Sequence, residues 1–177
     1  MRTALAPFMA IAISIVAVPA QAGEIQVPAG TSVLLKFLDP VDSATITEGA
    51  TVKFEVAANV LVQRAEIFRQ GTPAQGVVTD VSQPGIFGKN ARVHVAYLEV
   101  TATDGRPVRL SPLDISADMI RQAKDAGAAG GASLAGIIIL GPVGLAAGAF
   151  IRGGQVSVPA GAIGTTKVAE PFKLETP

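Results

Sequence analysis

The sequence has no cysteine, no tryptophan, one histidine and one tyrosine among its 177 residues. Without cysteine, the chain forms no disulfide, carries no lipid-attachment cysteine and offers no thiolate metal site. Charge is also scarce: 16% of the residues are charged, and 14 basic residues balance 14 acidic ones. Because Lys and Arg occur without runs, the charge pattern argues against nucleic-acid binding. The fold must therefore rest on apolar burial, for which 49% hydrophobic residues suffice.

The N-terminus has the features of a bacterial signal peptide. Arg2 precedes an apolar stretch from Ala4 to Val18, and Ala20-Gln21-Ala22 places small residues where signal peptidase cleaves. We expect residues 1–22 to be removed, which leaves an exported chain in the periplasm, the outer membrane or at the cell surface. The alternative is an uncleaved anchor, but the apolar stretch is short for a span of about 20 residues.

Between residues 23 and 112, apolar and polar residues alternate in short runs separated by Gly, Pro, Asn and Asp. This pattern is typical of half-buried strands. Short strands at such spacing predict a mainly β domain, either a small barrel or a sandwich. We expect strands at Ser32–Leu38, Thr51–Val56, Val60–Gln63, Glu66–Phe68, Gly76–Val81, Arg92–Thr101 and Val108–Leu110.

The strand expected at Arg92–Thr101 has apolar residues on both faces. Strict alternation groups Val93 and Val95 with Tyr97, and it places Leu98 and Val100 on the opposite face. We therefore expect the end of this strand to be buried on both sides.

A short pattern occurs three times in the chain. It reads VPAGTSVLLKF from Val27, FRQGTPAQGVV from Phe68 and VPAGAIGTTKV from Val158. Each copy has an apolar residue, a turn ending in Gly and a candidate strand. Two interpretations stay open: proteins rich in hairpins reuse such turns, or the three segments are equivalent turns leading into strands of one barrel.

Residues 113–152 differ in composition from the rest. Ser116 is placed to cap a helix over Ala117–Ala126, and Ala126–Ile151 then contains no charged residue. Pro142 interrupts a helix, so we expect a Gly-rich apolar helical hairpin before the closing strands and tail at residues 153–177. Small residues four apart form a glycine-zipper pattern that allows close approach of helices. The residues expected to contact a membrane or another copy are Gly127, Gly131, Gly136, Ile137, Ile138, Ile139, Gly144 and Gly148.

Three arrangements of the apolar stretch Ala126–Ile151 stay open. It can form a kinked membrane span, a hairpin inserted into a bilayer or an oligomer partner, or two helices packed on the β body. A continuous helix would be about 39 Å long at ~1.5 Å per residue, enough to cross the hydrocarbon core. A single crossing, however, would separate the closing strands from their partners.

Candidate catalytic residues are scattered. His94 lies inside an expected strand, and a lone histidine without cysteine is a poor metal site. Asp39 and Asp42 fit turns, whereas Asp114 and Asp118 fit the start of a helix. The sequence contains no nucleophile elbow, phosphate loop or zinc-protease motif. We therefore expect no enzymatic activity, no cofactor and no metal.

One loop residue is a candidate partner contact. Phe87 lies in the glycine-rich stretch 84–90, which is typical of a hairpin loop. The alternative is that its ring folds back on the core.

The segment VPAGTSVLLKFLDPVDSATITEGATVKFEVAANVLV, with GTPAQGVVTDV and GKNARVHVAYLEVTATDGRPVRL further on, resembles a family of uncharacterised exported, β-rich bacterial envelope proteins. In that family a Gly-rich stretch with a GPVGL-like motif, here Gly141–Leu145, precedes a closing VPAG strand, here Val158–Gly161. More distantly, the layout is similar to the β-barrel domain of the outer-membrane channel subunit of type IV secretion systems, whose hairpin enters the outer membrane. The inner-membrane anchor and Pro-rich arm of that subunit are not recognised here, so the resemblance implies no secretion role.

These features predict a non-enzymatic structural component of the envelope or cell surface, whose apolar hairpin inserts in a membrane or associates with copies of itself. The alternative is a soluble periplasmic binding or adaptor module with the apolar segment packed on its own body. An enzyme with a scattered site is the third class, and it would require a cleft with convergent polar groups.

Overall fold

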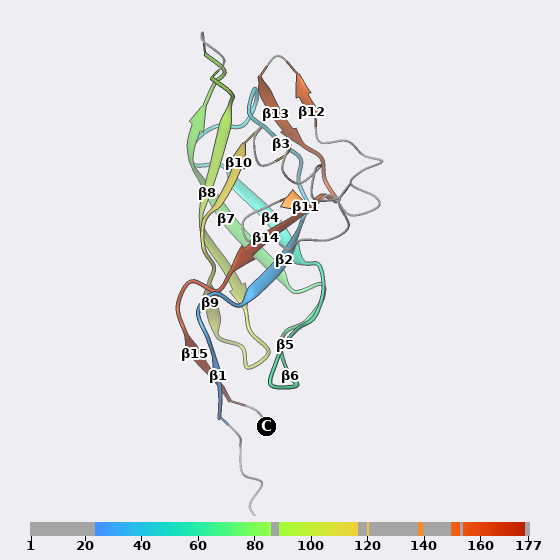
Figure 1. Ribbon diagram of the computed structural model, residues 1–177, viewed down its shortest axis with the longest axis vertical. Coiled ribbons are helices and arrows are strands. Elements are labelled where there is room, and N and C mark those ends of the chain that lie inside the picture. Colours follow the sequence, from blue (N-terminus) through green and yellow to red (C-terminus); the bar gives the residue numbers. More distant parts are fainter. Residues whose placement is uncertain are drawn as a thin grey trace, which may run out of the picture.

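The computed structural model describes residues 24–85, 89–116, 120, 138–139, 150–152 and 154–175. They form a mainly β fold around an eight-stranded sheet (Figure 1). Its strands are β2 (Ser32–Phe37), β4 (Thr51–Val56), β7 (Pro73–Ser82), β8 (Arg92–Thr101), β9 (Pro107–Arg109), β10 (Leu113–Ser116), β11 (Ile138–Ile139) and β14 (Ile163–Lys167). Their order is β10-β8-β7-β4-β2-β14-β11, with β9 also paired to β8. The expected strands Thr51–Val56 and Arg92–Thr101 are confirmed with the same bounds.

Three smaller sheets complete the described structure. They are formed by β1 (Glu24–Val27) with β15 (Phe172–Glu175), by β12 (Phe150–Arg152) with β13 (Gln155–Val158) and β3 (Val41–Asp42), and by β5 (Val60–Val62) with β6 (Ala65–Phe68). The β1–β15 ribbon extends from one end of the main sheet, whereas β3, β12 and β13 lie at the other end (Figure 1).

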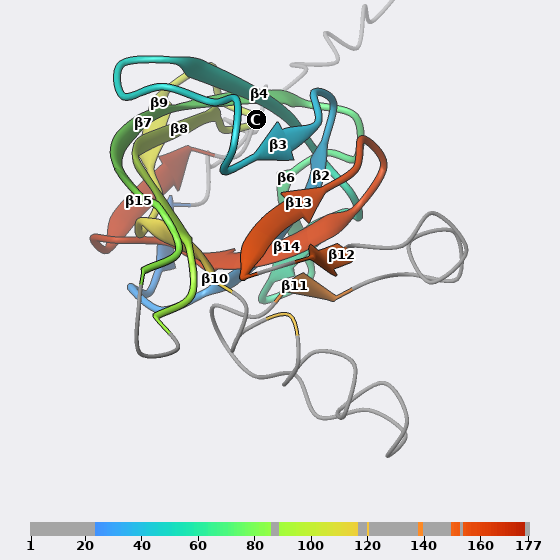
Figure 2. The same cartoon turned by 90° about the horizontal axis from the view of Figure 1, so that it is seen from above.

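The main sheet curls until its two sides meet. Leu110, after β9, forms an isolated bridge with Val168, after β14. The amide of Ser111 donates to the Lys167 carbonyl at 2.7 Å, and the amide of Ala169 donates to the Arg109 carbonyl at 3.1 Å. Seen from above, the strands therefore surround an interior (Figure 2).

That interior is filled by apolar side chains from alternate strand positions, as the period of two requires. Phe37 and Phe54 are fully buried and contact edge to face, with ring centroids 4.9 Å apart. Leu35, Leu98 and Leu113 are also fully buried. Burial of such side chains stabilises the fold by roughly 1.5–3 kcal/mol each, and no disulfide adds to this because the chain has no cysteine.

The sequence pattern that occurs three times corresponds to a turn that is repeated in the structure. Gly30, Gly71 and Gly161 all have φ between 82° and 86°, and each turn leads into a strand of the main sheet. In each turn the residue after Gly donates its amide to the carbonyl three residues earlier, the geometry of a type II turn. Gly49, before β4, adds a fourth turn of the same kind that the sequence pattern did not identify. The segments are thus equivalent turns in one sheet.

These turns work in reciprocal pairs. Before β2, Gly30 donates its amide to the Val168 carbonyl; before β14, Gly161 donates to the Phe37 carbonyl. In the same way, Gly71 donates to the Val56 carbonyl, and Gly49 donates to the Val78 carbonyl. The β2–β14 pair and the β4–β7 pair are therefore two copies of one backbone unit within the sheet.

A bulge in β8 corrects the expected two-sided burial of this strand. Tyr97 has φ 52° and occupies an extra position, because the pairing with β7 shifts between Gln75 and Val77. This shift returns Leu98 to the interior face of Val95 and leaves Tyr97 78% exposed. Gly76 makes room for the bulge: a Cβ there would lie 2.8 Å from Val95 Cγ1 and 2.9 Å from Leu98 Cδ2.

The expected helical structure over residues 113–152 is wrong at three places. Leu113–Ser116 forms β10, because Leu113 and Ile115 alternate into the core and pair with β8; the expected helix after Ser116 would begin outside the described residues. Ile138 and Ile139 form β11 on the edge of β14, where β-branched side chains favour a strand and pairing satisfies the backbone.

The third place is Phe150–Arg152, which forms β12 through a tight turn at Gly154 (φ 84°). The residues that the structure describes include no helix long and apolar enough to span a bilayer. Apart from Ile120, which is buried, the rest of the expected helix at Ala117–Ala126 lies outside the described residues.

Candidate functional site

Among the described residues, one groove lies on each copy of the repeated backbone unit; the groove on the β4–β7 copy is lined by outward residues and also by buried Phe54, Ala74 and Val100. The outward cross-strand pairs of β2 and β14 correspond in position to outward pairs of β7 and β4. The first set is Ser32–Lys167 and Leu34–Thr165, and the second is Pro73–Glu55 and Gln75–Lys53. Because side chains in strands alternate between faces, each set forms a patch pointing away from the core.

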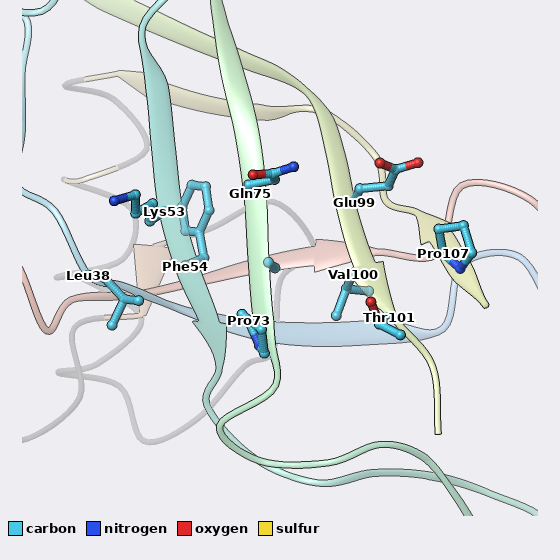
Figure 3. Close-up of a pocket in the computed structure, with 10 residues that line it drawn as sticks. Leu38, Lys53, Phe54, Pro73, Gln75, Glu99, Val100, Thr101 and Pro107 are labelled. Carbon is cyan, nitrogen blue, oxygen red and sulfur yellow. The ribbon is translucent and has the colours of Figure 1, made fainter. Parts of the chain in front are cut away.

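The groove on the β4–β7 copy has a volume of about 370 Å³. Lys53, Gln75 and Glu99 lie side by side across β4, β7 and β8, as Figure 3 shows. Two strand spacings of ~4.8 Å separate Lys53 from Glu99, or about 10 Å. Within the described part of the chain neither residue has an ion-pair partner. Pro73 and Pro107 contribute apolar surface along the groove.

This arrangement places a cation, an amide and an anion in one row. Such a row suits a partner that itself carries both charges and amide groups, as a polypeptide segment does. The row lies on the exposed face, so each contact would be screened by solvent and contribute little alone.

The groove on the β2–β14 copy is larger, about 550 Å³. Its floor carries Leu34, Thr165 and Lys167, and its wall is formed by residues 58–61 at the start of β5. The lining described for it contains one cation and no carboxylate. Sequence patterns did not identify either groove, because both are assembled from residues far apart in the chain.

A polar network fixes the end of the body where the apolar stretch rejoins it. Ser43 is fully buried, and its Oγ donates to Gln155 Oε1 at 2.6 Å and accepts from the Val156 amide at 2.9 Å. Gln83 Nε2 donates to the Ser43 carbonyl at 2.6 Å, and Gln155 Nε2 donates to Gln83 Oε1 at 3.2 Å. The network joins the β3 turn, the end of β7 and β13, so the β12–β13 hairpin is held against the body.

His94 forms a cross-strand pair. Its Nδ1 lies 2.5 Å from Asp114 Oδ1 on β10, and Asp80 is its register partner on β7. Asp114 is therefore a strand residue rather than the expected helix-start residue. Neither His94 nor Asp114 lines either groove. In the regions with described positions, no group of three His, Asp or Glu side chains is placed to hold a metal ion.

Several residues proposed from the sequence lie outside the described residues. These are Phe87, Gly127, Gly131, Gly136, Ile137, Gly144 and Gly148. Ile138 and Ile139 are placed in the sheet as β11.

Comparison with known proteins adds no assignment: no protein-family model and no curated protein matches this chain.

Proposed function

We propose that the protein is a non-enzymatic, exported component of the bacterial envelope, whose β body holds the apolar stretch Ala126–Ile151 against a membrane or a second copy. The observation that carries this proposal is the attachment of an uncharged stretch to a rigid sheet. Buried Ile120 precedes the stretch. Within the stretch, β11 pairs with β14, and at its end β12 pairs with β13.

Export is supported by the signal-peptide pattern of residues 1–22. Cleavage before Gly23 would leave the whole of β1, which begins at Glu24, in the mature chain. β1 pairs along its length with β15, and Val27 and Leu174 are buried. Every described strand would thus remain in the mature chain.

The free energy of apolar burial supports an apolar contact for the stretch. Water-exposed apolar surface costs roughly 25 cal/mol per Å² relative to its burial, and Ala126–Ile151 carries no charge to offset that cost. A bilayer or the same stretch of another copy would cover it.

A second candidate function is a periplasmic adaptor, with the apolar stretch packed on the chain's own body. The β4–β7 groove favours this alternative, because unpaired Lys53 and Glu99 flank Gln75 on an exposed face. That row would recognise a polypeptide segment of mixed charge.

Fractionation of a Gram-negative host expressing the full gene product with its own signal tests the first proposal. Deletion of Ala126–Ile151 is unsuitable, because it removes β11 and most of β12. The double substitution Gly131→Lys and Gly144→Lys instead introduces charge and leaves both strands in place. We expect the unmodified protein to stay with the outer-membrane fraction at high salt and the variant to be released into the soluble fraction.

The matched control adds two lysines elsewhere, as Thr51→Lys and Gln70→Lys at exposed positions of the body. It should fractionate like the unmodified protein. Recovery of the unmodified protein as a soluble periplasmic monomer would contradict the first proposal and support the adaptor alternative.

A further inference from the structure

We propose that the groove on the β2–β14 copy binds the head of an amphiphilic anion, an organic carboxylate or phosphate ester attached to an apolar chain. The inference is independent of the role proposed for the apolar stretch. It rests on the arrangement of six residues from three segments, which are Ser32, Leu34, Asn59, Leu61, Thr165 and Lys167.

The floor of the groove is made by two adjacent cross-strand pairs. Ser32 lies opposite Lys167, and Leu34 lies opposite Thr165. Hydroxyl and ammonium groups are therefore concentrated at one end of the floor, next to an apolar side chain. The volume of the groove, about 550 Å³, lies in the range of volumes found for small-molecule binding sites.

The unpaired hydroxyl of Thr165 also supports ligand binding in this groove. The residue is 3% exposed and lines the groove, yet its hydroxyl has no hydrogen-bond partner among the residues described. Buried hydroxyls are nearly always paired, so an unpaired one calls for a missing partner. The oxygen atom itself is fully buried in this rotamer, so it reaches a bound oxygen only after rotation about χ1 to another staggered position.

The charge at the site is not neutralised. Lys167 has no ion-pair partner among the described residues, although the equivalent position in the other copy, Glu55, pairs with Lys36 Nζ at 2.8 Å. Lys36 belongs to the adjacent strand β2, which lies next to β4. Lys53 in the other groove also has no ion-pair partner among the described residues, but it shares that groove with the Glu99 carboxylate, whereas no described carboxylate lines the groove of Lys167.

The wall supplies a further donor and an apolar surface. Asn59 uses Oδ1 to accept the Gln70 amide at 2.7 Å, which fixes the side chain and leaves Nδ2 as the group able to donate to a ligand. Leu61 is 61% exposed beside it. Donors from Lys167, Asn59, Ser32 and Thr165 match an oxyanion, and Leu34 with Leu61 matches a short hydrocarbon chain.

Titration of the purified full-length chain with defined amphiphiles tests the site. The probes are n-octyl phosphate and octanoate, with octyl glucoside as the uncharged control and inorganic phosphate as the control without a chain. We expect at least one octyl anion to bind saturably and raise the unfolding temperature, whereas octyl glucoside leaves it unchanged and inorganic phosphate binds at least tenfold more weakly. The preferred head group distinguishes a carboxylate from a phosphate source.

Two substitutions and a matched control assign the binding to this groove. Lys167→Gln should weaken binding of the octyl anion at least fivefold, whereas Lys53→Gln, the same charge change in the other groove, should leave it unchanged. Thr165→Val should raise the unfolding temperature without ligand, since it removes an unpaired buried hydroxyl, and reduce the shift that ligand causes. Failure of both octyl anions to bind, equal losses in the two lysine variants, or equal binding of octyl glucoside would overturn the proposal.

Discussion

The β2–β14 pair and the β4–β7 pair have the same backbone arrangement but carry different outward side chains. Both are entered through type II turns with a glycine of positive φ, and both are locked by reciprocal bonds from those turns. Their outward side chains differ: the β2–β14 pair presents Thr165 and Lys167, and the β4–β7 pair presents Lys53 and Glu55 at the equivalent positions.

Their interior positions differ as well. Leu35 faces Gly164 in the first pair, and Gly76 faces Val52 at the equivalent place in the second. Each pair thus contributes one glycine and one larger side chain, on opposite strands. Turn geometry therefore fixes the backbone unit, whereas the side chains around it determine both packing and the chemistry of each groove.

The largest effect that separates the two copies is expected at these interior glycines. Gly76→Ala should lower the free energy of unfolding by about 2–3 kcal/mol, because the added Cβ meets Val95 at 2.8 Å and Leu98 at 2.9 Å. Gly164→Ala should cost only about 1 kcal/mol, since the nearest atoms, on Phe37 and Leu113, lie at 3.3 and 3.4 Å. Chemical denaturation measures both, and equal losses would contradict this account of the packing.

Substitution of the turn glycines should show how similar the copies are. Gly30, Gly49, Gly71 and Gly161 all have φ of 82–86°, and an added Cβ at any of them meets nothing within 4 Å. The cost of Ala is therefore purely conformational, about 1 kcal/mol at each position. Denaturation midpoints of the four single variants should agree. If one variant loses several times more stability than the others, the four turns are not equivalent.

The smallest effect concerns the charged positions. Lys36→Gln should reduce stability by about 0.5 kcal/mol at low salt and less at high salt, because its partly exposed ion pair with Glu55 is screened. Lys167→Gln should change ligand-free stability by less than that, since no described carboxylate pairs with it. A salt-dependent loss in Lys167→Gln as large as that in Lys36→Gln would show that Lys167 is already neutralised.

Much of the sheet could be predicted from the sequence because its signals are local. The alternation in Thr51–Val56 directly reports one buried face, and the turn pattern from Val27, Phe68 and Val158 identifies three of the four equivalent turns. The face of Tyr97 could not be predicted, because a bulge changes the period of two and depends on Gly76 in a neighbouring strand.

The errors in residues 113–152 have a similar cause. Asp114 has the local features of a helix-start residue, but Leu113 and Ile115 on either side of it are buried in the core and pair with β8, which makes the segment a strand. Ile138 and Ile139 lie in a composition typical of close-packed helices, and the edge of β14 that pairs with them is remote in sequence. Both grooves were missed for the same reason: Thr165 and Leu34 become neighbours only through strand pairing.

The most direct test of the proposed function is sedimentation of the purified chain with and without lipid vesicles. We predict that the chain either floats with vesicles or sediments as an oligomer in buffer, and that Gly131→Lys with Gly144→Lys abolishes whichever association is found while β-sheet content is retained. A monodisperse monomer that does not bind vesicles would contradict the claim that the uncharged stretch requires an apolar partner outside its own chain.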